Sequence, residues 1–194
     1  MKGKQIASIS VDEKEMERAA RLLSGIPDGV ERACLNAMNR ALLEGRTAGT
    51  KTVRKEYAIH AADVRKSFAM HRASRKNLSA ELVSRGRYLP LSKFRYKPTS
   101  DTTGNKRKQV RVAVKNTGFK PLGQAFIWGG KVMQRVETVS YNVRQAHTVS
   151  VPQMMDNPEV SEAVKETMNA AIGKRLNHEI DRMLKGYEGE AVWR

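Results

Sequence analysis

The pattern of apolar and polar positions changes twice along the chain. Residues 11–57 and 157–186 carry apolar side chains every three or four positions, as amphipathic helices do. Residues 61–152 instead contain short runs that alternate or are rich in β-branched residues, as strands are. This order predicts an α+β fold, with two N-terminal helices and a long C-terminal helix flanking an antiparallel sheet of about four strands.

The two N-terminal helices each open on a capping signal. Asp12 is followed three residues later by Glu15, and Asp28 by Glu31. A glycine and a proline separate the two helices, and the second is predicted to run to about Tyr57.

A stripe of small residues lies in the second half of that second helix. Ala41, Gly45, Ala48 and Gly49 share one side of it. Since each glycine costs roughly 1 kcal/mol of helix propensity, we expect close packing of another helix or subunit to compensate.

The middle segment is predicted to hold the strands. A short helix at Ala61–Lys66 precedes them, a Gly-Gly hairpin turn lies between Trp128 and Lys131, and residues 98–108 form a polar, mobile loop. The expected strands are residues 78–84, 110–115, 124–128 and 132–139.

The last helix has the clearest pattern. It opens with Asn157 as cap and a proline at the first helical position, and it carries an apolar stripe that includes Ile172 and Leu176. Its acidic residues, among them Glu162 and Glu179, are expected to lie on the solvated face.

Length and composition favour one soluble domain over residues 1–194. A chain of 194 residues can bury one core but is short for two. Neither a membrane-spanning run nor a signal peptide is evident, so we expect a protein made in the cytoplasm. The single cysteine, Cys34, lies on an apolar helix face and is expected to be a buried, inert thiol.

The sequence offers no basis for catalysis. Its four histidines are scattered, and at His178-Glu179 the position that would complete an HExxH zinc motif is Arg182. Phosphate-binding, dinucleotide-binding and GxSxG motifs are also missing. We therefore expect no catalytic residue, no metal ligand and no cofactor.

Positive charge is concentrated in the middle of the chain. Residues 51–120 hold 19 Lys and Arg against 4 Asp and Glu, which accounts for +15 of the net charge of +16. A field of this kind favours an anionic partner, either nucleic acid or acidic surfaces of neighbouring subunits, although a solvated basic face remains an alternative.

The basic residues occur in groups. Lys51, Arg54 and Lys55 come first, near the end of the second helix. Aromatic residues interleave with the basic residues, namely Tyr57, Phe68, Tyr88, Phe94 and Tyr96. They are either platforms for stacking nucleic-acid bases or half-buried strand residues. No sequence-specific nucleic-acid motif is present, so any contact with DNA would be non-specific. The candidate DNA-facing or partner-facing residues are Arg65, Lys66, Arg72, Arg75, Lys76, Arg85, Arg87, Lys106, Arg107 and Lys108.

Four strings occur in an order that resembles a known family. They are VRKEYAIHAADVRKSFAMHRAS at 53–74, SRGRYLPLSKF at 84–94, AFIWGGKVMQRV at 125–136, and SVPQMM at 150–155 followed by a helix containing RLNHEIDRML at 175–184. Together they resemble the prophage minor tail protein Z family over roughly residues 30–186.

The resemblance implies a structural virion protein without catalytic residues. Its expected place is the head-proximal end of a long phage tail, beside the tail terminator, the head–tail connector and the tail tube. Proteins of this kind usually form rings, often hexameric, around the DNA channel. The rival interpretation is a free, non-specific nucleic-acid-binding protein, and no membrane partner is implied.

Overall fold

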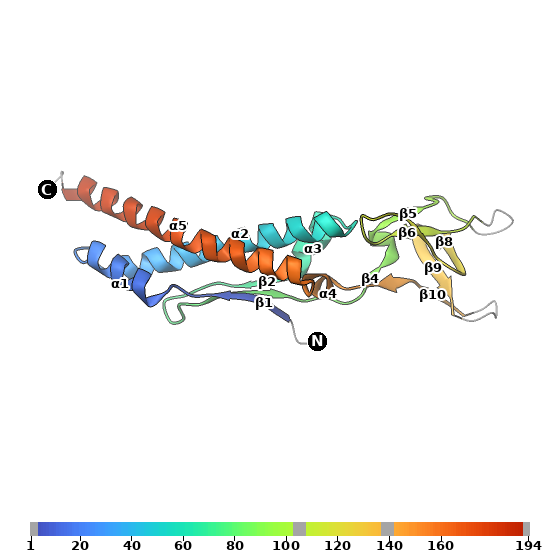
Figure 1. Ribbon diagram of the computed structural model, residues 1–194, viewed down its shortest axis with the longest axis horizontal. Helices are drawn as coiled ribbons and strands as arrows, with labels where there is room; N and C mark the ends of the chain where they lie inside the picture. Colours follow the sequence, from blue (N-terminus) through green and yellow to red (C-terminus); the bar gives the residue numbers. More distant parts are fainter. Residues whose placement is uncertain (1–3, 103–107, 137–141, 192–194) are drawn as a thin grey trace.

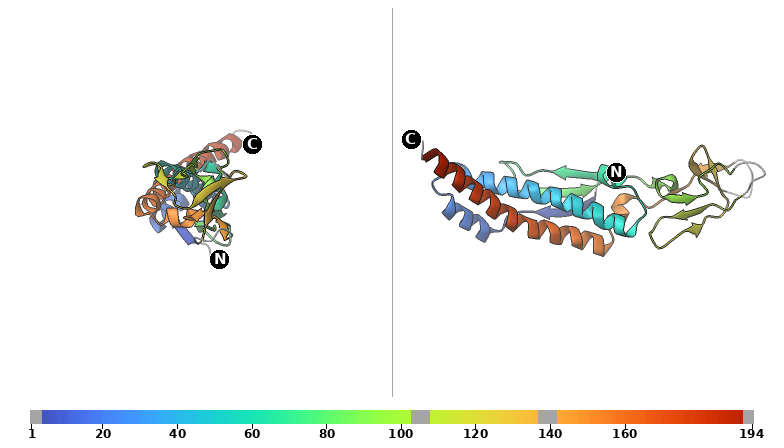
Figure 2. Two further views of the ribbon diagram at one scale, coloured as in Figure 1. Left: turned by 90° about the vertical axis from the view of Figure 1, so that its right-hand side faces the viewer. Right: turned by 90° about the horizontal axis from the view of Figure 1, so that it is seen from above.

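The protein is elongated, with the long helices and one small sheet along one half and the other short strands at the opposite end (Figures 1 and 2). We describe it from a computed structural model, which describes residues 4–102, 108–136 and 142–191. The two long helices lie side by side along the molecule, and the C-terminal end of α5 points away from the strand-rich end.

The predicted helices are present. The short segment at residues 61–67 and the two long helices all form close to their expected bounds, and α5 continues past residue 186. The helices are α1 Glu13–Leu22, α2 Gly29–Glu56, α3 Ala61–Ser67, α4 Val151–Met155 and α5 Pro158–Ala191, with a 3-10 turn at Leu91–Lys93.

The α+β class is confirmed, but the strands form four small antiparallel sheets in the described residues instead of one sheet. Their orders are β1-β3-β2, β10-β9-β8, β11-β4 and β5-β6-β7. The strands are β1 Lys4–Ile9, β2 Phe68–His71, β3 Ala80–Ser84, β4 Leu89–Pro90, β5 Arg95–Lys97, β6 Arg111–Ala113, β7 Lys120–Pro121, β8 Ala125–Trp128, β9 Lys131–Arg135, β10 Val143–Gln145 and β11 His147–Thr148.

The four expected strands correspond to β3, β6, β8 and β9, with residues 137–139 of the last one outside the described residues. Several of the others are only two or three residues long, which is too short for alternation to be visible. The β1 strand pairs with β3 far along the chain, and α2 and α5 cover this sheet.

Close packing of α2 against α5 forms the centre of the core. The small-residue stripe of α2 faces α5, as the sequence predicts for a close helix contact. A methyl group added at Gly45 would lie 2.4 Å from Cγ and 2.5 Å from Sδ of Met168, and one at Gly49 would lie 3.1 Å from Cγ2 of Val164. The two helix backbones therefore approach more closely than a larger residue would permit.

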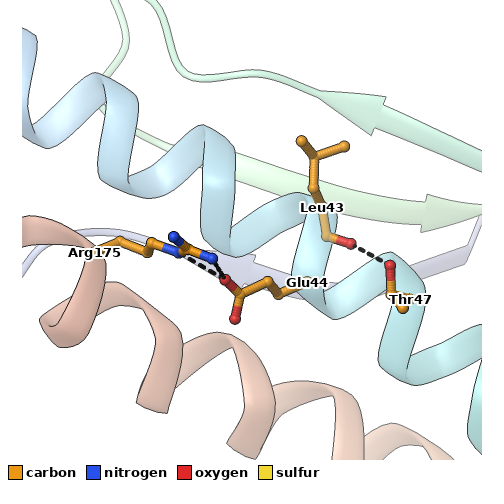
Figure 3. Close-up of polar contacts among 4 residues, drawn as sticks. All are labelled: Leu43, Glu44, Thr47 and Arg175. Atoms are coloured by element: carbon orange, nitrogen blue, oxygen red, sulfur yellow. Dashed lines mark hydrogen bonds and ion pairs between the residues drawn. The ribbon is translucent and has the colours of Figure 1, made fainter. Parts of the chain in front are cut away.

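A cross-helix ion pair lies beside this contact. The Arg175 guanidinium on α5 donates to a Glu44 carboxylate oxygen on α2, with Nε 2.7 Å from Oε1 (Figure 3). One turn further along α2, the Thr47 hydroxyl donates to the Leu43 carbonyl at 2.9 Å. A groove of about 970 Å³ runs along this side of the two helices.

Helix capping differs in part from the sequence prediction. Neither Asp12 nor Asp28 makes a side-chain cap bond, and Asp28 has φ 53°, in the left-handed region. The full capping box is instead Ser150 with Gln153, at the start of α4. At α5 the prediction is confirmed, because the Asn157 side chain accepts a hydrogen bond from the backbone N–H of Glu159 at 3.2 Å.

The apolar stripe of α5 is buried as predicted at Leu176, and Ile172 is partly buried against the core. Glu179 corrects the expectation of a solvated charge, since it is only 7% exposed. Its carboxylate accepts hydrogen bonds from Asn36 of α2, at 3.1 Å, and from Arg182. These two partners compensate the carboxylate for the water lost on burial.

We expect Gly45→Ala to destabilise the protein although alanine favours helix. Overpacking against Met168 should cost about 1–3 kcal/mol, which exceeds or cancels the roughly 1 kcal/mol gained in helix propensity. Gly173→Ala on α5 is the matched control, because a methyl group there meets nothing within 4 Å. It should raise the free energy of unfolding by up to about 1 kcal/mol.

Chemical denaturation of the two variants measures both changes. Equal stabilisation by Gly45→Ala and Gly173→Ala would show that α2 and α5 are not packed at Gly45.

Candidate interaction surface: a cationic β tip

The described residues between 85 and 150 form the strand-rich end of the molecule, which we call the tip (Figure 1). They include 12 of the chain's 36 Lys and Arg, and the one acidic residue among them is Asp101. Their net charge of +11 is most of the +16 of the whole chain. The structure therefore places most of the positive charge toward one end of the long axis, while the helical end is nearly balanced.

The tip is attached to the C-terminal end of α2. The Asn116 side chain donates to the carbonyls of Arg54 and Lys55, at 3.0 and 2.9 Å, and so caps the helix. The Asn116 side chain in turn accepts a hydrogen bond from Arg95 at 2.8 Å. Backbone pairing of Tyr57 with Lys115 continues the connection.

The outer face of the β5-β6-β7 sheet, defined by Arg95, Lys97 and Arg111, is cationic. All three side chains are exposed, and Lys97 lies directly opposite Arg111 in the strand register. Like charges placed directly opposite each other destabilise a sheet. Lys97 lies over the Phe119 ring, 5.1 Å from its centroid. This face is therefore suited to a partner that brings negative charge.

The ten sequence-predicted basic residues do not form one surface. Arg72, Arg75 and Lys76 lie in the β2–β3 connection, at the helical end of the molecule, where Arg75 pairs with Asp28 at 3.5 Å. Arg65 and Lys66 are exposed on α3, whereas Arg85 and Arg87 are exposed directly after β3, at the base of the tip. Lys108 is exposed just before β6, and Lys106 and Arg107 lie outside the described residues.

A second cationic feature lies between α2 and α3. A groove of about 400 Å³ is lined by Lys51, Arg54 and Lys55 together with Arg65. The spacing of three and four residues along α2 places its three cations on one helix face. Among the ten sequence-predicted basic residues, Arg65 lines this groove.

Several tip cations were absent from the sequence-derived candidates. Lys97, Arg111 and Lys120 fall inside the basic segment, and Lys131 and Arg135 lie beyond its end at residue 120. The near absence of acidic residues between 85 and 150 is the sequence signal that would have found them. Only the fold shows that this stretch forms one end of the molecule.

The interleaved aromatics are mostly structural. Tyr57 and Phe94 are buried, and Phe68 and Tyr96 are partly buried, as expected for half-buried strand residues. Tyr88 differs, because it is 59% exposed.

In the described parts of the chain, no group of three or more His, Cys, Asp or Glu side chains is arranged to hold a metal ion. None of the described helices is long and apolar enough to cross a membrane. The Cys34 thiol is buried as predicted, and desolvation by burial raises its pKa.

Comparison with protein families identifies the chain. The family model described as Prophage minor tail protein Z (GPZ) matches residues 14–188. The chain belongs to this family. No curated protein and no solved structure matches it. The minor tail protein Z assignment makes it a phage tail structural protein, associated with the virion, and it confirms the resemblance carried by the four strings.

We expect Cys34 of this minor tail protein Z to react slowly with Ellman's reagent at neutral pH. The reactive species is the thiolate, and burial both shields the sulfur and raises its pKa. The rate should increase sharply in denaturant. A native rate equal to the denatured rate would contradict the packing of α2.

Proposed function

We propose that this protein completes the phage tail at its head-proximal end. Copies of the protein form a ring there, which we expect to be hexameric, around the DNA channel. Its neighbours there are the tail terminator, the head–tail connector and the tail tube. The role is structural, without a catalytic step. The cationic tip is the part of each subunit that faces the channel.

The observation that carries this proposal is the division of charge along the molecule. The family match supports a place in the tail, and the described residues of the tip carry 12 cations against one acidic residue. In a ring, tips that point inward repel one another unless a polyanion lies between them. Duplex DNA carries one negative charge per roughly 1.7 Å of helix axis, so it would offset that repulsion.

A second candidate is a free protein that binds nucleic acid without sequence preference. The same acid-poor tip favours it, because Lys and Arg bind phosphate by charge alone. The two functions differ in where the protein resides, since a ring component stays with the particle.

We expect the protein to co-purify with tails and to appear only at the end that joins the capsid. Gold labelling of a tagged chain on intact virions, viewed by electron microscopy, measures this position. A protein that is removed by washing the virions, or that is labelled along the whole tail, would contradict the proposal.

We expect the double change Lys97→Glu and Arg111→Glu to weaken DNA binding. If each residue contacts one phosphate, loss of both should reduce the slope of log K against log salt by about 1.8, at 0.9 per contact. Exposed cations usually alter stability by only about 0.5 kcal/mol, so folding should persist. Titration of a labelled duplex at several salt concentrations measures the slope.

The matched control is Arg72→Glu with Lys76→Glu, which also replaces one Arg and one Lys but at the helical end. It should leave the slope nearly unchanged. An equal loss in both double variants would show that the tip has no special part in binding DNA.

A further inference from the structure

The outer face of the β8-β9-β10 sheet combines apolar and basic side chains. Alternation places Phe126 and Trp128 on the same face of β8, and the register pairs them with Met133 and Lys131 of β9. The next pair on that face is Arg135 with Val143 of β10. The opposite face holds Ile127 and Val132, both fully buried, so the outer face is the one left to solvent.

Trp128 is the most prominent side chain of this face. It is 59% exposed, and Val143 is 44% exposed, although both would gain from burial. Tryptophan is one of the residue types enriched among the side chains that dominate binding at protein interfaces. An exposed tryptophan with apolar neighbours on a sheet therefore indicates a contact surface.

The turn that presents Trp128 is held in place before any partner arrives. Gly129 and Gly130 have φ of 54° and 69°, which glycine adopts without strain and which a tight hairpin requires. The Gly129 N–H donates to Asp101 at 3.3 Å, and the Tyr96 hydroxyl donates to the Gly130 carbonyl at 3.3 Å. The backbone of the turn therefore has little conformational entropy left to lose on binding.

The chemistry of the face favours protein over nucleic acid. Arg135 lies over the Phe126 ring, 5.7 Å from its centroid, so this ring face is not free to stack a base. Met133 and Val143 offer nothing to a phosphate, whereas Met, Phe, Trp and Arg are the residue types enriched at protein interfaces.

The charge of the face defines the partner further. Lys131 and Arg135 are exposed, and Asp101 is the one acidic residue among the described residues of the tip. An acidic partner surface would meet both cations without like-charge repulsion.

We propose that this face, made of Phe126, Trp128, Lys131, Met133, Arg135 and Val143, docks an acidic protein surface with an apolar centre. It is distinct from the cationic β5-β6-β7 face, which the proposed function directs at DNA. The inference rests on the proposed tail function only for where the partner is found.

The test uses DNA-free tails assembled without this chain, to which purified full-length protein is added. Trp128→Ala should weaken binding about 30-fold, as expected for an anchor residue at an interface. Tyr88→Ala is the matched control, because Tyr88 is equally exposed but lies outside the face. Circular dichroism verifies that both variants are folded.

Charge-reversal variants distinguish the two faces of the tip. Lys131→Glu with Arg135→Glu should weaken binding to the DNA-free tails at least tenfold, whereas Lys97→Glu with Arg111→Glu should change it less than twofold. Equal binding of Trp128→Ala and Tyr88→Ala, or equal effects of the two charge pairs, would overturn the docking proposal.

Failure of the proposed function has a different signature, because the wild-type protein itself would then not bind the tails. Photo-cross-linking from a benzoylphenylalanine at position 128, in phage-producing cells, still tests whether this face docks a protein. An adduct with a different, acidic protein supports it. An adduct with DNA or with a second copy, or no adduct at all, overturns it.

Discussion

The close contact between α2 and α5 is the interaction on which the rest of the structure depends. Gly45 and Gly49 let Met168 and Val164 of α5 approach the α2 backbone, and the Glu44–Arg175 pair lies beside the same contact. Together the two helices cover the β1-β3-β2 sheet. A larger residue at Gly45 would force the Met168 side chain to shift within the contact between α2 and α5.

The same contact fixes where the tip projects. α2 runs from the α1 end of the molecule to the base of the tip, and Asn116 caps its last carbonyls from within the tip. A further link is the Lys93–Asp63 pair, at 3.0 Å, which joins the tip to α3. The positive charge on the described residues of the tip is therefore held at one end of a packed helical layer.

Much of this fold could be predicted from the sequence, for reasons visible at particular residues. The apolar stripe of α5 repeats over many turns, and the glycines at 129 and 130 specify a tight turn, so both were predictable from local pattern. Two-residue strands such as β4 and β11 carry no periodicity, and their pairing depends on contacts between residues far apart in the chain. Glu179 was misjudged because its partner, Asn36, comes from another helix.

The interaction surface was less predictable than the fold. Charge counting found the basic region, but it grouped Arg72 and Lys76 with residues that the fold places at the other end of the molecule. The outer face at Trp128 depends on strand register, which composition does not reveal.

The orientation of the subunit in the particle tests the central claim most directly. A cryo-electron microscopy map of the head-proximal end of the tail would show it at the resolution of secondary structure. The account predicts a ring of elongated subunits with residues 85–150 directed toward the DNA channel and the α2–α5 layer outside. A map in which the tips point outward, or in which the subunit lies elsewhere on the tail, would contradict it.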